Sequence, residues 1–436
     1  MPEKEANDKK SISLITLEPG HFHSALLQKS MYPDVDSTVH VYAPQGDELN
    51  AHQKLIDQFN NRSEAPTSWN QTLYTGNDFF EKMLSEKAGN VVVLAGNNLK
   101  KTNYILRSVE GGFNVLADKP MAIDSGSFEL LKKAFETAAA KNVLLYDIMT
   151  ERYEISTILQ RELSLLPGIF GELEKGTPEN PAVTKESVHH FYKYVSGNVL
   201  TRPSWFFDVK QEGEGIVDVT THLVDLIQWE CFPDQVIDYK KDVEFNSARR
   251  WPTQLTLSQF KAITKKDSFS GFLAGNITDD SILSVFANGE INYKLRGVHA
   301  KASVKWVYKA PEGTSDTHSS IMRGTKANLV IRQGAEENYK PELYIETIGK
   351  KDSAIAELFK GLQSKYPGIE LKENAKGWQV VIPAKYKEGH EAHFARVAEK
   401  FLGYLKNGDM PAWEVPNMIA KYYITTTALE LAKKSK

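Results

Sequence analysis

The five residues VVVLA at positions 91–95 form an apolar run in which apolar and polar residues do not alternate. A strand that is buried on both faces of a parallel sheet has this pattern. Similar short runs alternate with segments of helical length along the first third of the chain, which predicts a doubly wound α/β fold. The other predicted strands lie at residues 12–17, 39–43, 114–116 and 143–146, and the predicted helices at residues 24–29, 47–59, 78–87, 99–110 and 126–139. We therefore expect a domain with a parallel sheet over residues 11–150.

The residue pattern changes after residue 151, where segments rich in aromatic and β-branched residues follow one another. These predicted strands lie at residues 187–194, 281–287, 291–295, 302–308, 327–331 and 342–346. Their spacing favours a mostly antiparallel sheet, and helical periodicity returns at residues 216–229, 394–405 and 417–433. We expect an α+β domain over residues 151–436 that binds the substrate, mediates homo-oligomerisation and ends in helices. Residues 358–389 contain several Gly and Pro residues, and we interpret them as an insertion.

The composition excludes several classes of protein. The 436 residues are 41% hydrophobic and 25% charged, which is typical of a globular protein and not of a disordered chain. The 53 Lys and Arg residues nearly balance the 56 Asp and Glu residues, so we expect no nucleic-acid partner. The longest apolar runs are far shorter than the roughly 18 residues of a membrane span, so we expect none. The single cysteine, Cys231, cannot form an intramolecular disulfide and leaves the redox compartment open.

The first ten residues are polar and lack the apolar stretch of a signal peptide. We expect a disordered tail at residues 1–10 and, from the sequence as it stands, a cytoplasmic protein. A polar segment of this kind also remains after a signal or lipid-anchor segment has been removed, so a periplasmic or lipid-anchored protein stays open.

The first predicted strand runs into the turn EPGHFHSA at residues 18–25. In a dinucleotide-binding fold this turn is rich in glycine, because the backbone must approach a pyrophosphate at the start of a helix. Only Gly20 fits that pattern; if it is the middle glycine, Glu18 and His23 take the outer two positions. A carboxylate at residue 18 would repel a pyrophosphate unless it points away. A plain turn between strand and helix fits the sequence equally well.

The second predicted strand is not followed by the acidic residue that usually holds the ribose hydroxyls. No arginine that would bind a 2′-phosphate follows it either, so NAD is preferred only weakly and NADP stays open. The candidate cofactor-binding residues are Gly20, His21, Phe22, His23, Asn97, Asn98, Asp118 and Lys119.

Two motifs carry candidate catalytic residues. The first, ADKP at residues 117–120, places Lys119 at the carboxyl end of a strand, where open α/β sheets bind ligands. Lys-Pro alone more often only ends a strand. The second, EGEGIVDVTTHLVD at residues 212–225, puts Asp218, His222 and Asp225 on one face if residues 216–229 are helical. That face could also be solvated. A histidine with a carboxylate one turn away resembles a pair of metal ligands, but a zinc site takes three or four ligands, and we predict no metal site.

Together, in this order, the two motifs resemble the glucose-fructose oxidoreductase, inositol dehydrogenase and rhizopine-catabolism (Gfo/Idh/MocA) family of nicotinamide-dependent enzymes. The resemblance covers residues 11–229 well and the last helices loosely. It implies that Lys119 contacts the substrate hydroxyl and the nicotinamide, that His222 is the acid/base, and that Asp218 orients His222 or shares its proton. It also implies a cis Lys119–Pro120 bond.

The sequence departs from the family at several places. Asp118 replaces the glutamate of the family's Glu-Lys-Pro motif, and Asn97-Asn98 replaces the usual Thr-Pro. No histidine follows in the next helix. Residues 232–389 resemble a variant substrate domain of bacterial proteins that act on carbohydrates.

We expect polar and aromatic residues around His222 to bind a carbohydrate, although each could instead be structural. They are Glu151, Arg152, His189, His190, Tyr192, Arg202, Trp205 and Asp225. The leading hypothesis is an NAD-dependent sugar or glycoside dehydrogenase. A glycoside hydrolase that oxidises its substrate transiently and retains its cofactor is the alternative, and a non-catalytic cofactor-binding protein is the third possibility.

Overall fold

The computed structural model describes residues 12–195, 198–278, 281–349 and 354–435. The predicted tail at residues 1–10 lies outside the described residues. The chain divides into two compact units. The first comprises Met1–Met121, Glu129–Ile148 and Phe394–Met410, and the second comprises Ala122–Phe128, Met149–His393 and Pro411–Lys436. Within the described ranges, no helix has both the length and the apolar character that crossing a membrane requires.

The first unit is built on a six-stranded sheet in the order β3-β2-β1-β4-β5-β6, in which every pair of neighbours is parallel. The strands are β1 (Leu14–Leu17), β2 (Thr38–Tyr42), β3 (Asn70–Tyr74), β4 (Val91–Leu94), β5 (Asn114–Asp118) and β6 (Leu145–Ile148). This order confirms the doubly wound, Rossmann-like fold. Every residue of β1 and of β4 is buried. For β4, the apolar run at residues 91–95 predicts this burial.

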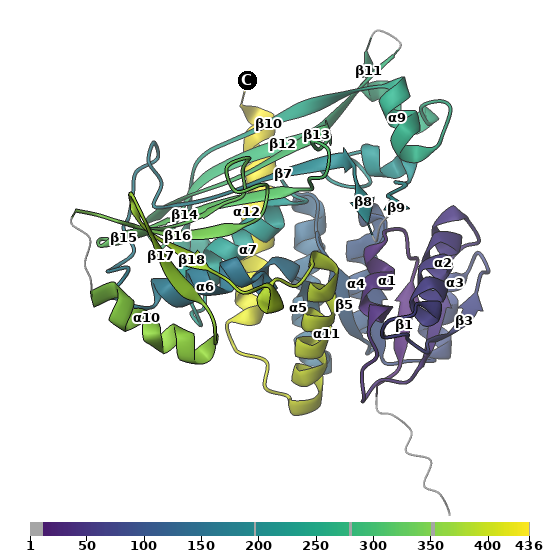
Figure 1. Ribbon diagram of the computed structural model, residues 1–436. Coiled ribbons are helices and arrows are strands. Elements are labelled where there is room, and N and C mark those ends of the chain that lie inside the picture. Colours follow the sequence, from purple (N-terminus) through teal and green to yellow (C-terminus); the bar gives the residue numbers. More distant parts are fainter. Residues whose placement is uncertain (1–11, 196–197, 279–280, 350–353, 436) are drawn as a thin grey trace, which may run out of the picture. The chain divides into compact units, whose positions relative to one another are not determined.

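Helices follow most of these strands (Figure 1). They are α1 (His23–Leu26), the 3-10 turn η1 (Leu27–Lys29), α2 (Asp47–Asn61), α3 (Phe79–Glu86), α4 (Asn98–Glu110) and α5 (Ser125–Lys141). The sequence predicted the helices but missed β3, because this strand lies at the edge of the sheet and carries the polar sequence NQTLY. A later helix, α11 (His390–Asn407), contributes most of its length to the same unit.

The second unit contains a ten-stranded sheet, and among its described residues only β7 and β13 are parallel neighbours. Its strands in spatial order are β10 (Val243–Thr256), β12 (Ile282–Leu295), β13 (Val298–Lys309), β7 (Val183–Tyr192), β14 (Thr317–Arg323), β15 (Ala327–Arg332), β16 (Glu342–Thr347), β18 (Gly377–Val381) and β17 (Glu370–Asn374), with β11 (Ile277–Thr278) beside β12. The prediction of a mostly antiparallel sheet is confirmed. A separate small sheet pairs β8 (Tyr194–Val195) with β9 (Asn198–Val199).

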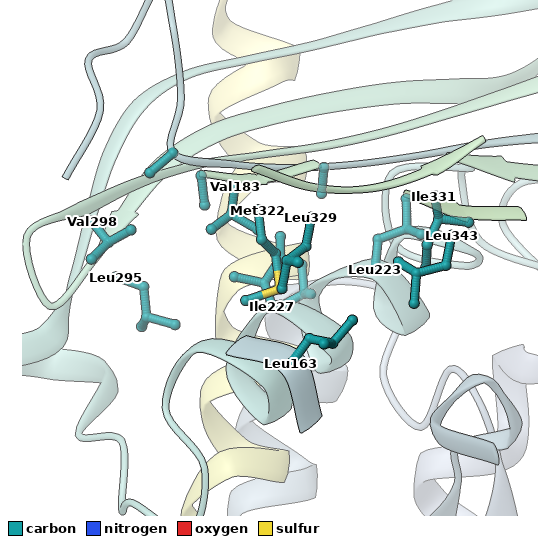
Figure 2. Close-up of a cluster of buried hydrophobic side chains, with 14 of the residues drawn as sticks. Leu163, Val183, Leu223, Ile227, Leu295, Val298, Met322, Leu329, Ile331 and Leu343 are labelled. Atoms are coloured by element: carbon teal, nitrogen blue, oxygen red, sulfur yellow. The ribbon is translucent and has the colours of Figure 1, made fainter. Parts of the chain in front are cut away.

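The helices of the second unit include α6 (Ile155–Ser164), α7 (Thr220–Cys231) and α12 (Glu414–Lys434). Shorter elements are η2 (Thr150–Tyr153), η3 (Ser204–Phe207), α8 (Tyr239–Asp242), α9 (Leu257–Thr264), η4 (Gly271–Asn276), α10 (Ala354–Lys365) and η5 (Ala384–Tyr386). Figure 2 shows the core, where Leu223 of α7 lies beside Ile331 and Leu343 of the sheet. Ile227 of α7 lies below Val183, Met322 and Leu329 of the sheet, and Leu163 of α6 belongs to the same cluster.

Two expectations for this unit need correction. The strands predicted at 281–287 and 291–295 form the single strand β12. The helix predicted from residue 216 begins at Thr220, after a turn. Residues 358–389, which we interpreted as an insertion, include the end of α10 and the strands β17 and β18, which complete one side of the sheet.

Candidate active site

The turn after β1 crosses the carboxyl end of β4. The backbone N–H groups of Gly20 and His21 both donate to the carbonyl oxygen of Ala95, at 3.2 and 3.1 Å. Gly96 makes this approach possible, since a Cβ atom there would lie 2.4 Å from the carbonyl oxygen of Glu18. The turn therefore passes over β4 and reaches toward β5.

Glu18 adopts a positive φ of 41°, and its carboxylate is directed to α4. Its Oε2 accepts a hydrogen bond of 2.6 Å from the Tyr104 hydroxyl, and its Oε1 lies 3.3 Å from Lys100 Nζ. The carboxylate is thus compensated by two partners on one helix. Burial, together with the hydrogen bond to Glu18, raises the pKa of the Tyr104 hydroxyl, which keeps this donor protonated.

The hydrogen bonds of Glu18, Gly20 and His21 bear on whether the turn can hold a dinucleotide. The charge of Glu18, which would repel a pyrophosphate, is directed to Tyr104 and Lys100. The N–H groups of Gly20 and His21, however, are already bonded to Ala95. The residues fit a dinucleotide if side chains of the turn replace these two backbone donors.

Two histidines of the turn meet the last residue of β5. His23 Nδ1 lies 2.8 Å from Asp118 Oδ2, and His21 Nδ1 lies 3.9 Å from the same oxygen. Lys101 Nζ donates to the carbonyl oxygen of Asp118 at 3.1 Å. The structure therefore brings together three of the residues predicted to bind the cofactor.

The remaining predicted cofactor residues lie at the ends of β4 and β5. Asn97 caps α4, since its Oδ1 accepts the backbone N–H of Leu99 at 3.0 Å. Asn98 follows it and is buried. Lys119 directly follows β5, and the predicted cis bond between Lys119 and Pro120 is confirmed.

The second motif forms a turn that leads into α7. A Cβ atom at Gly215 would lie 1.8 Å from the carbonyl oxygen of Ala287, so only glycine lets the turn pack against β12. The hydroxyls of Thr220 and Thr221 donate to backbone carbonyls of this turn at 2.9 and 2.8 Å. Asp218 therefore precedes the helix and does not stack within it.

The residues of this motif are buried. Asp218 and His222 are 4% and 8% exposed, and Asp225 is 2% exposed. The alternative of a solvated helix face is therefore wrong.

Glu151 of η2 lies among three histidines from distant parts of the chain. Its Oε1 is 3.3 Å from Nδ1 of His390, the first residue of α11. Burial alone would raise the pKa of Glu151, but His318, His390 and His222 outweigh it and hold the pKa well below its usual range. The carboxylate is therefore charged, and it acts electrostatically on His222. Glu151 and His222 are among the residues predicted from the sequence. His318 and His390 are not, because the sequence offers no local motif for them.

A second cluster of charged groups surrounds Asp316. His189 Nδ1 lies 3.2 Å from its Oδ2, His190 Nδ1 lies 3.1 Å from its Oδ1, and Lys193 Nζ lies 2.8 Å from its Oδ2. Burial raises the pKa of Asp316, but Lys193 and His189 outweigh it and hold the pKa well below its usual range. The rings of His189 and His318 lie edge to face with centroids 5.6 Å apart, so this cluster adjoins the histidines around Glu151.

Two predicted substrate residues, Arg152 and Asp225, bind each other. Arg152 Nε and Nη2 donate to the two carboxylate oxygens of Asp225 at 2.6 and 2.7 Å. Lys421 Nζ also donates to Asp225 at 2.8 Å, and Arg152 Nη1 donates to Glu414 at 3.1 Å. This is a buried ionic network with the features of a structural element.

The other three predicted substrate residues lie among aromatic side chains. Arg202 is buried, donates to the carbonyl oxygen of Phe191 at 2.9 Å and lies over the ring of Phe206. Trp205 packs at the margin of the same cluster, and Tyr192 lies at the end of β7. Arg202 is thus engaged by the protein itself, whereas Trp205 and Tyr192 are only partly buried.

Comparisons with known proteins give a consistent result. Residues 159–433 match the family model described as "Putative oxidoreductase C terminal domain". The chain is 56% identical to a putative oxidoreductase of known structure from Parabacteroides merdae, with a TM-score of 0.94 over 97% of this chain and 98% of that chain. The chain matches no curated protein.

More distant structures share the fold. A putative myo-inositol dehydrogenase from Sinorhizobium meliloti has 14% identity and a TM-score of 0.57, over 98% of each chain. Levoglucosan dehydrogenase, in a complex with NADH and levoglucosan, has 12% identity and a TM-score of 0.61, over 97% of each chain.

Proposed function

The chain belongs to the Gfo/Idh/MocA family of oxidoreductases, and from this premise we propose that it transfers a hydride between NAD(H) and a carbon bearing a secondary hydroxyl of a sugar or polyol. The observation that carries the proposal is the setting of His222, a buried imidazole within the electrostatic influence of the charged Glu151. Oxidation of an alcohol releases a proton, so it needs a base beside the reacting carbon.

His222 acts as that base. A nearby carboxylate stabilises the imidazolium that forms when the hydroxyl proton is taken up. Glu151 supplies this charge, and its low pKa means that it does not compete for the proton. Asp218, which is buried in the turn that leads into α7, orients the imidazole of His222.

Lys119 holds the hydroxyl oxygen. A lysine ammonium donates hydrogen bonds and stabilises the alkoxide charge that develops as the proton leaves. Its place directly after β5 is the end of the sheet at which open α/β folds bind their ligands.

NAD, when bound, accepts the hydride. The residues that would hold it are the turn at Gly20 to His23 together with Asn97, Asn98 and Asp118. Support for NAD and for a carbohydrate comes from levoglucosan dehydrogenase, which binds NADH and levoglucosan, and support for a polyol comes from the myo-inositol dehydrogenase. The relatives named above are oxidoreductases, so the hydrolase alternative has no support among them.

Two measurements test the proposal. Titration with NAD, NADH and NADP should raise the melting temperature. At a hundredfold excess over its Kd, a bound nucleotide raises the free energy of unfolding by about 2.7 kcal/mol. A panel of sugars and polyols with NAD should then give a rise in nicotinamide absorbance for at least one substrate. If no nucleotide binds at millimolar concentration, the proposal is wrong. If a nucleotide binds but no substrate is turned over, the non-catalytic alternative replaces it.

A further inference from the structure

We propose that His21, His23 and Asp118 form a binding site for one divalent first-row transition-metal ion such as Zn²⁺ or Co²⁺. This inference goes beyond the proposed function, because hydride transfer to NAD requires no metal. It concerns the first unit alone.

The fold brings the three residues together from two distant parts of the sequence. His21 and His23 lie in the turn after β1, and Asp118 ends β5; β4 lies between these two strands. The turn is fixed across the end of β4 by the two hydrogen bonds to Ala95 and by the absence of a side chain at Gly96. The sequence shows two histidines without a third ligand, and only the fold supplies the carboxylate.

The donor atoms fit a transition-metal ion. One ligand atom from each of the three residues lies within 4.8 Å of the other two, and both Nδ1 atoms approach the same carboxylate oxygen. Two imidazole nitrogens with one carboxylate oxygen form a set that binds zinc and iron and leaves a position open for water or a ligand. An ion with Zn–N and Zn–O distances of about 2.0–2.2 Å lies between its ligand atoms. To admit it, the 3.9 Å separation between His21 Nδ1 and Asp118 Oδ2 closes slightly and the 2.8 Å separation between His23 Nδ1 and Asp118 Oδ2 opens slightly.

The hydrogen bonding of His21 agrees with this role. Its Nδ1 accepts the backbone N–H of His23 in a long hydrogen bond of 3.4 Å, so the lone pair is on the nitrogen that faces the cluster. A metal ligand must offer a lone pair, and the metal ion would replace this weak bond.

Aromatic rings fix both imidazoles. Phe22 contacts the rings of His21 and His23, with centroids 4.5 and 4.4 Å apart, and Phe394 lies 4.6 Å from His23. Asp118 and His23 are 4% and 9% exposed, so an ion there would be largely shielded from water. An apolar shell of this kind holds ligands in place and limits access of solvent. The site also contains a positive charge, because Lys101 Nζ donates to the Asp118 carbonyl oxygen.

The experiment measures metal binding without nucleotide. The full chain is freed of metal with a chelator and dialysed against Zn²⁺ or Co²⁺, and bound metal is quantified. We expect one equivalent per chain and, for Co²⁺, visible absorption bands of a coordinated ion. Asp118→Asn and His21→Gln should each weaken binding at least tenfold. His40→Gln is the matched control, because His40 lies on β2 of the same unit and outside the cluster.

The outcomes are distinct. Absence of stoichiometric binding to the wild-type chain overturns the proposal, as does unchanged binding in both variants. If Asp118→Asn fails to fold, His21→Gln decides, because the His21 side chain is 17% exposed and is the more tolerant position. A chain that binds metal but no nucleotide retains this site while the proposed function fails. A chain that binds nucleotide but no metal shows the reverse.

Discussion

The Tyr104 hydroxyl donates a hydrogen bond of 2.6 Å to the carboxylate of Glu18 across 86 residues of sequence. Glu18 stands at the entrance of the turn in which the family has glycine. The bond ties its carboxylate to α4 and so lets an acidic residue occupy a turn proposed to bind an anionic cofactor.

A pair of substitutions tests this relationship. Tyr104→Phe should weaken NAD binding roughly fivefold to tenfold, because it removes the donor that holds the Glu18 carboxylate and about 1 kcal/mol of hydrogen bonding. Glu18→Gln should bind NAD at least as well as the wild type. The double variant should match Glu18→Gln, measured by fluorescence titration. Equal weakening by Tyr104→Phe in both backgrounds would show that Tyr104 acts independently of Glu18.

The pairing of Arg152 with Asp225 gives a prediction about stability. Asp225→Asn should lower the free energy of unfolding by about 3–5 kcal/mol, because it leaves Arg152 and Lys421 buried without their shared carboxylate. Asp234→Asn is the control: its side chain is 73% exposed and lies 3.8 Å from Arg161, so the change should stay within about 0.5 kcal/mol. Urea denaturation monitored by circular dichroism measures both. A small effect at Asp225 would indicate that the network is open to solvent.

The sequence predicts the first unit more completely than the second for a physical reason. Strands buried on both faces must be apolar throughout, and β1 and β4 are visible in the sequence for that reason. The edge strand β3 has three exposed residues of five and gives no such signal. β10 contains Pro252, which argues against a strand, but the structure accommodates it at a shift of register between Trp251 and Thr253.

The candidate site also contains residues that local motifs indicate and residues that only the fold brings together. Lys119 and His222 lie in local motifs, so the sequence could select them. The grouping of Glu151 with His318 and His390 depends on how η2, β14 and α11 fold together, and no spacing in the sequence indicates it. The sequence favours Arg152 as a substrate-binding residue. Its partners Asp225 and Glu414 lie 73 and 262 residues away, so the sequence does not indicate that they pair with it.

The buried His52 makes stability depend on pH. Burial lowers the pKa of His52 from 6.5 to about 4 in the folded chain. Below pH 6.5 the unfolded chain binds a proton that the folded chain does not, so stability falls as the pH drops toward 4, by about 3 kcal/mol in total. His52→Gln should remove this slope in urea denaturation between about pH 4 and pH 8. Near pH 8 both proteins should show only a constant offset, and an unchanged slope in the variant would contradict the assignment.

Lys119 and His222 are proposed to act on one proton transfer, and a double variant tests this. Lys119→Ala and His222→Ala should each reduce kcat by roughly 10²–10⁴-fold, as expected for acid/base groups, while the affinity for NAD stays nearly unchanged. Because both act on the same hydroxyl, the double variant should be little worse than the more damaged single variant. Asp218→Asn should be milder if its carboxylate only orients His222, and as severe if it takes the proton itself. Steady-state kinetics on a substrate found in the panel measures all four. A wild-type kcat in His222→Ala would remove His222 from the mechanism, and fully multiplicative losses would mean that the two residues serve different steps.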